Sequence, residues 1–206
     1  MQGLISAYKV KIDVKELKKS LLFSEECGIE LATGDDREIF KWFLLSILFG
    51  ARINETIAKN TYRVFEKYHL LEPEKIIEVG WDFLVNPIMR EGGYVRYDFK
   101  TSSKLLKICE TLIFEYNGSL NKLHETALDS RDLEKRIDDF YGIGPLTTNI
   151  FLREMRPFWE KANPPPLPTV LEVANNIGID LSGYDRKSRD FVRIEAGLIR
   201  LRSKLK

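Results

Sequence analysis

A Gly-Ile-Gly-Pro segment at 142–145 constrains this chain more than any other part of its sequence. Glycine has no Cβ atom, so two glycines around one aliphatic residue allow a sharp turn whose backbone closely approaches another group. Pro145 suits the first turn of a helix, where its missing N–H is not needed. The segment therefore predicts a tight hairpin between a helix over 130–140 and a second helix over 145–155.

This hairpin would present backbone donors to solvent. The N–H groups of Gly144, Leu146 and Thr147 would point outward from a helix N-terminus, which carries partial positive charge and suits a phosphate. Together with Gly142 and Ile143, these residues form a candidate contact with a nucleic-acid backbone. The alternative interpretation is a plain tight turn between two helices.

The rest of the chain predicts an all-α fold, because apolar residues recur at helical spacing and no segment alternates as a strand would. A loop is expected at the paired glycines of 91–94, and Thr169 is expected as an N-cap. Asp129 or Ser130 is expected to cap the helix before the hairpin. We expect helices or short apolar elements over 36–49, 57–68, 81–89, 101–116, 130–140, 145–155 and 170–177. A further short helix is expected to open at Pro73, and a last one from 186 onward.

Charge is distributed unevenly along the chain, although the net charge is only +1. The segment 186–206 holds eight Lys or Arg against two Asp or Glu, a local charge of +6, which leaves −5 for the remaining residues. A basic C-terminal segment fits contact with phosphates. A solvated helix face explains the same charges equally well.

Only two cysteines are present, Cys27 and Cys109, which excludes a disulfide framework and any four-cysteine metal or iron–sulfur site. Cys109 lies on the apolar face of the helix over 101–116, so we expect it in the core. The start of the chain lacks an apolar signal region, and the longest apolar run, 42–51, is shorter than the ~20 residues that span a bilayer. We therefore expect no membrane partner and a cytoplasmic or nucleoid-associated location.

Four segments, in this order, resemble the helix-hairpin-helix base-excision DNA glycosylases, and most of all their endonuclease III branch. The hairpin at 142–149 is the most specific, since it resembles the family form Gly-Val-Gly-x-Lys-Thr-Ala-Asn. The other three are an apolar helix end at 46–55, the glycine pair and following helix at 91–116, and the helix at 172–178. The resemblance covers roughly 36–179.

This resemblance implies a two-lobed all-α fold with a central cleft. One lobe would span 36–157, with the helix-hairpin-helix motif at about 130–156, and the other would combine 1–35 with 158–206. Family members act in base excision repair: they flip a damaged base out of duplex DNA and cut its N-glycosidic bond. No iron–sulfur cluster is expected, because no cysteine follows Cys109 and the family's four-cysteine loop is therefore absent. The resemblance allows a monovalent cation at the hairpin.

The sequence departs from the family where the chemistry is done. Bifunctional members use a lysine in the second hairpin helix, and that slot holds Leu146, which cannot form a Schiff base. The family's catalytic aspartate corresponds to Leu167 or, with a one-residue slip, Pro168. Glu172 is the nearest carboxylate and the candidate replacement; the alternative is a solvated helix position.

Other residues have both a functional and a structural interpretation. Arg52 falls where relatives place a side chain that fills the gap left by a flipped base; the alternative is a salt-bridged surface arginine. Tyr94, Tyr97 and Trp159 would either stack a base or belong to the core. The two histidines, His69 and His124, are expected to have no special role.

Three hypotheses follow from these observations. The first is a protein that binds damaged or distorted duplex DNA on the glycosylase fold and lacks the standard catalysis. The second is an active, divergent, monofunctional glycosylase that uses Glu172 or another acid. The third is a protein-interaction module that keeps the fold without binding DNA. The first is preferred, because the hairpin glycines are present while the catalytic lysine and aspartate are missing.

Overall fold

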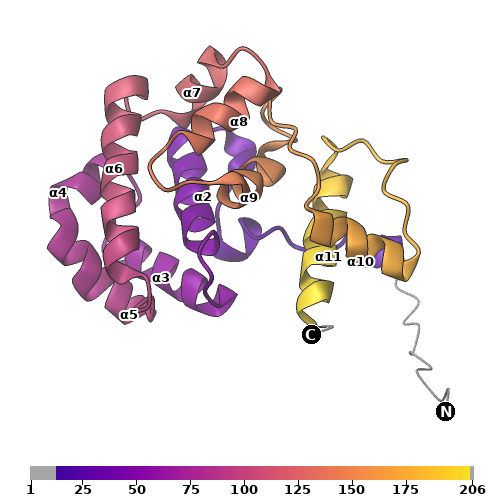
Figure 1. The fold of residues 1–206 in the computed structure, drawn as a ribbon, viewed down its shortest axis with the longest axis horizontal. Helices are drawn as coiled ribbons and strands as arrows, with labels where there is room; N and C mark the ends of the chain where they lie inside the picture. The colour runs from indigo at the N-terminus through magenta and orange to yellow at the C-terminus, as the bar shows by residue number, and fades with distance from the viewer. Residues whose placement is uncertain (1–12, 205–206) are drawn as a thin grey trace. The chain divides into compact units, whose positions relative to one another are not determined.

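The structure is a computed structural model that describes residues 13–204, and over this range every regular element is a helix (Figure 1). The expected all-α fold class is therefore confirmed. No helix in the described range is long and apolar enough to cross a membrane. Contacts divide the chain into a larger unit, 24–164, and a smaller unit formed by 1–23 together with 165–206.

The larger unit extends beyond the lobe predicted over 36–157 at both ends. The backbone N–H of Ser24 donates to a carboxylate oxygen of Glu154 at 3.1 Å. At the other end, the ring of Trp159 packs edge-on against Phe151 with centroids 5.6 Å apart. These buried contacts lie outside the helical pattern from which the lobe was predicted.

The larger unit is built around α2 (Asp36–Phe49), on which α3, α7 and α9 pack. Most of α2 is buried, and the indole Nε1 of Trp42 donates to the carbonyl oxygen of Phe151 at 2.9 Å. The remaining elements of this unit are η1 (Glu25–Cys27), η2 (Leu31–Thr33), α3 (Glu55–Lys67), α4 (Pro73–Phe83), η3 (Leu84–Met89), α5 (Arg90–Gly92), α6 (Asp98–Tyr116), α7 (Leu120–Thr126), α8 (Ser130–Asp138) and α9 (Pro145–Met155). Aromatic rings fill the space between α2 and the hairpin, since the ring centroid of Phe43 lies 5.7 Å from that of Phe140 and 4.9 Å from that of Phe151.

The expected loop at 91–94 is wrong in part. Glu91 and Gly92 belong to the helical turn α5, and only Gly93 adopts the left-handed conformation that ends it. Gly92 is required for a different reason, because a Cβ atom there would lie 2.5 Å from the Cα atom of Thr61. The pair of glycines thus marks one close helix contact and one helix end.

Two further elements differ from expectation in the same region. Helix α6 begins at Asp98, before the first residue of the periodic pattern at 101. Helix α7 (Leu120–Thr126) was not expected, because seven residues give too short a pattern. The side chain of Ser119 caps α7 by accepting from the N–H of Lys122.

The smaller unit contains α1 (Val14–Leu17), α10 (Pro168–Ile177) and α11 (Arg189–Lys204), which share one apolar core. The prediction that Thr169 is the N-cap of this last-but-one helix, α10, is wrong. Pro168 occupies the first helical position of α10, which makes Leu167 the N-cap residue. Gly178 ends the same helix in the left-handed conformation, as expected.

Candidate nucleic-acid interface

The segment between α8 and α9 forms the tight turn that its two glycines predict. Gly142 has a φ of 72°, a left-handed conformation that favours glycine, while Gly144 is extended and serves as the N-cap residue of α9. The N–H of Ile143 donates to the carbonyl oxygen of Phe140 at 3.0 Å, and its side chain is buried. The turn is therefore anchored by the buried side chain of Ile143, while Gly142 is exposed and Gly144 is half-buried.

The N-terminus of α9 offers backbone donors without acceptors. Thr148 is the first residue of this end whose N–H forms a helical hydrogen bond, which it donates to the carbonyl oxygen of Gly144 at 3.1 Å. Within the described part of the chain, the N–H groups of Gly144, Leu146 and Thr147 have no acceptor. This arrangement can bind an anion through several N–H groups and the helix dipole.

Close packing against α2 fixes the position of this helix end. The side chain of Thr147 is buried, and a Cβ atom on Gly50, the C-cap residue of α2, would lie 2.0 Å from its Oγ1 atom. Asp138 at the end of α8 accepts a short hydrogen bond from Thr148 Oγ1. These contacts hold the free amides on rigid elements.

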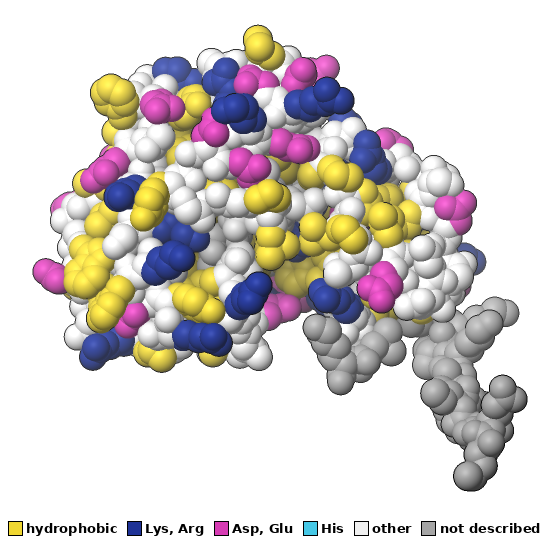
Figure 2. Space-filling view, viewed as in Figure 1, with side chains coloured by type: hydrophobic (Ala, Val, Ile, Leu, Met, Phe, Trp, Pro, Cys, Tyr) yellow, Lys and Arg dark blue, Asp and Glu magenta, His cyan; other side chains and the backbone are white. Residues whose placement is uncertain are grey.

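Lysines of α6 lie beside the turn, and the sequence analysis did not identify them as part of the site. The Cε atom of Lys104 is 3.0 Å from the position that a Cβ on Gly142 would take. The ammonium of Lys107 lies 4.0 Å from the ring centroid of Tyr141, which is about half exposed. The only available signal was their helical spacing with Lys100, because their closeness to the turn is a tertiary contact. Figure 2 shows Lys and Arg side chains among exposed apolar ones on the side of the larger unit that carries α6.

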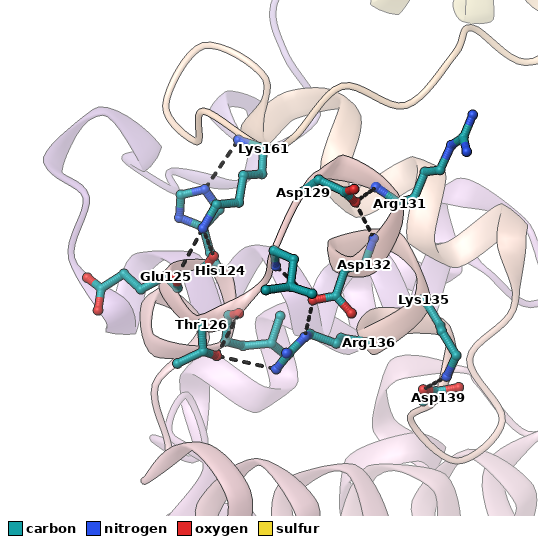
Figure 3. Close-up of polar contacts among 12 residues, drawn as sticks. His124, Glu125, Thr126, Asp129, Arg131, Asp132, Lys135, Arg136, Asp139 and Lys161 are labelled. Carbon is teal, nitrogen blue, oxygen red and sulfur yellow. Dashed lines mark hydrogen bonds and ion pairs between the residues drawn. The ribbon is translucent and has the colours of Figure 1, made fainter.

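Two basic side chains of α8, by contrast, form ion pairs with neighbouring carboxylates (Figure 3). Lys135 binds Asp139, and Arg136 binds Asp132 at 2.8 Å. The N–H of Leu128 and then the Arg136 guanidinium hold the pKa of the Asp132 carboxyl below its usual value. Lys135 and Arg136 therefore supply little free positive charge to the turn.

The positions that the resemblance to glycosylases assigned to catalysis hold side chains without the required chemistry. Leu146 is half exposed at the start of α9. Leu167 packs against the core of the smaller unit, and Pro168 opens α10. Glu172 is exposed on α10, which fits the alternative interpretation of a solvated helix position. Nearby, the carboxylate of Asp180 accepts from both the N–H and the hydroxyl of Ser182 at 2.8 Å.

The other candidates divide between surface and core. Arg52 is exposed in the bend after α2, in the larger unit that also holds the hairpin. Tyr94 is fully buried, and its hydroxyl donates to the carbonyl oxygen of Leu48 at 2.8 Å. Trp159 is also buried, so both rings are core residues and neither is available to stack a base, whereas Tyr97 is half-buried.

His124 lies in the last turn of α7, and His69 lies just after the end of α3. His124 stacks on Trp159 with centroids 4.7 Å apart, and its Nε2 accepts from the N–H of Lys161 at 3.4 Å (Figure 3). His69 ends α3 with a φ of 57°. Cys109 is fully buried on α6, which confirms its expected place in the core.

The described residues include no group of three or more His, Cys, Asp or Glu side chains that could hold a metal ion. Comparison with known proteins gives no relative: a scan against family models and searches of curated proteins and solved structures found no match.

Proposed function

We propose that this protein binds duplex DNA through the backbone amides of the α8–α9 turn, as a member of the helix-hairpin-helix glycosylase superfamily. The observation that carries the proposal is the set of unpartnered N–H groups at Gly144, Leu146 and Thr147 on a rigid helix end. Backbone amides bind phosphate without reading the base sequence, so the proposal concerns DNA shape and damage rather than a sequence motif.

Binding without base excision is the form of the proposal that the side chains support. Leu146 and Leu167 are aliphatic, and Pro168 has no acidic group, so none of these positions supplies a nucleophile or a carboxylate. Recognition of damaged or distorted duplex remains physically consistent, because the amide donors do not depend on those side chains.

The basic C-terminal segment contributes less to this proposal than its charge suggests. Arg193 donates to the carbonyl oxygen of Ser20 at 2.7 Å, and the guanidinium of Arg200 lies 4.2 Å from the ring centroid of Phe23. Asp190 binds Lys18 at 2.7 Å. Part of α11 is thus committed to holding the smaller unit together.

The test is fluorescence anisotropy with a labelled duplex that contains an abasic-site analogue and with the matching undamaged duplex, each at two salt concentrations. Tighter binding to the abasic duplex would support recognition of damage. Equal affinity for the two duplexes that falls with salt would mean that the protein binds the DNA backbone and does not distinguish damage. Absence of binding to both would refute the proposal and favour a protein-interaction module. Base release from a panel of lesion duplexes, lost in Glu172→Gln, would instead show a divergent glycosylase.

A further inference from the structure

Three lysines form a row along one face of α6, which we call the α6 lysine row: Lys100, Lys104 and Lys107. Their spacing of four and then three residues places them on the same side of the helix. Because each residue advances ~1.5 Å along an α-helix, the row is about 10 Å long.

The row meets the α8–α9 turn at two points. Lys104 contacts Gly142 so closely that even a methyl group there would meet its Cε atom at 3.0 Å. Lys107 lies over the ring of Tyr141, the residue immediately before this glycine. The middle and the end of the row are therefore continuous with the backbone that carries the free amides of α9.

The row lacks the acidic partners that other lysines have. Among residues 13–204, the ion pairs include Lys67 with Glu91 and Lys75 with Glu78, and none involves a lysine of the row. Lys104 is half-buried, and burial together with the charge of Lys100 lowers its pKa. A partly desolvated cation with no counter-charge costs free energy in the unbound protein, and an external anion would offset that cost.

We propose that the α6 lysine row binds consecutive phosphates of the same DNA strand whose neighbouring phosphate is held by the α9 amides. A DNA strand advances ~3.4 Å per nucleotide along the duplex axis, so a row of about 10 Å matches roughly three nucleotides. The row provides charge, and the turn provides directed hydrogen bonds. This inference rests on the proposed function and extends its footprint from one helix end to a strand.

The first test replaces Lys104 with Met, which keeps an unbranched apolar stem against Gly142 and removes the charge. Binding to a 20-base-pair duplex is measured over a series of salt concentrations, beside urea unfolding of the free protein. We expect several-fold weaker binding at 0.1 M salt and a slope of log affinity against log salt that is smaller by about 0.9. The free protein should be as stable as the original or more so, because an unpaired half-buried charge is gone. If Lys104 had only a structural role, Lys104→Met would keep the salt slope and lower the stability of the free protein.

The matched control is Lys75→Met, which removes the same charge from a lysine already paired with Glu78. Its salt slope should equal that of the unchanged protein. The double variant Lys100→Gln and Lys107→Gln alters only exposed side chains, so folding is not at risk, and its slope should fall by about 1.8.

The outcomes separate this inference from the proposed function. If the unchanged protein binds the duplex and the row variants keep its salt slope, the row is not a contact, while the amide site stands. If the unchanged protein binds no duplex at either salt concentration, both proposals are wrong.

Discussion

Gly144 allows the proposed amide site to be altered without disturbing the fold. Its φ of −147° and ψ of 175° are extended, which any residue adopts, and a Cβ atom there would have no heavy atom within 4 Å. As the N-cap residue of α9, an aspartate at this position would accept hydrogen bonds from the N–H groups of Leu146 or Thr147. Gly144→Asp therefore occupies the donors and adds a negative charge where the phosphate is proposed to lie.

The size of the effect follows from Coulomb's law. Two like charges about 5 Å apart repel by ~0.8 kcal/mol at the dielectric constant of water and by ~3 kcal/mol at an effective value of 20. Since 1.4 kcal/mol is a factor of ten, Gly144→Asp should weaken DNA binding by roughly fourfold to more than a hundredfold. Gly144→Asn caps the helix without adding charge, so it should lose less DNA affinity. Gly144→Ala leaves the amides free and should bind DNA nearly as well as the unchanged protein.

Anisotropy titrations of the three variants at one salt concentration provide the assay, with urea unfolding alongside. Asp and Asn are better N-cap residues than Ala, so both variants should be at least as stable as Gly144→Ala. Loss of binding by Gly144→Asp in a fully folded protein would support the amide site. Equal affinity of the Asp and Ala variants would show that the amides of α9 do not contact DNA.

Three further changes have defined outcomes. Gly92→Ala should destabilise the fold by about 2 kcal/mol in urea unfolding, because its methyl group meets Thr61, whereas Gly183→Ala, with open space, should change little. Burial raises the pKa of the Cys27 thiol from its ordinary value of 9.0 to about 11, so alkylation at pH 8 should be about a hundredfold slower than for an exposed thiol, and unfolding should remove the difference. Leu146→Lys should steepen the salt slope by about 0.9; an unchanged slope would contradict the proposed phosphate position.

The sequence predicted best those elements whose ends carry a chemical signal. Helix α2 runs from Asp36 to Phe49 because Asp35 caps its start and glycine follows its end. The turn after α8 was likewise predicted from Gly142 and Gly144, since their conformations are local. Such features need no knowledge of distant residues.

The errors have two sources: tertiary contacts that the sequence does not reveal, and one local signal that was misjudged. The glycine pair at 92–93 was interpreted as a loop, but Gly92 is needed for close approach to Thr61, a residue 31 positions earlier. Thr169 was preferred as an N-cap, although Pro168 before it is the stronger signal for a first helical position. The lysines of α6 were missed for the same reason as the first error, because nothing local places Lys104 beside Gly142.

The proposed site separates DNA binding from chemistry in physical terms. The donors at Gly144, Leu146 and Thr147 are backbone groups, so they persist whichever side chains occupy these positions. The resemblance to glycosylases assigns catalysis instead to side chains, and the positions that it points to hold Leu146 and Leu167 or Pro168. A chain can therefore lose base excision by side-chain replacement and keep the phosphate contact. Binding of an abasic duplex without release of any base from lesion duplexes is the outcome that this separation requires.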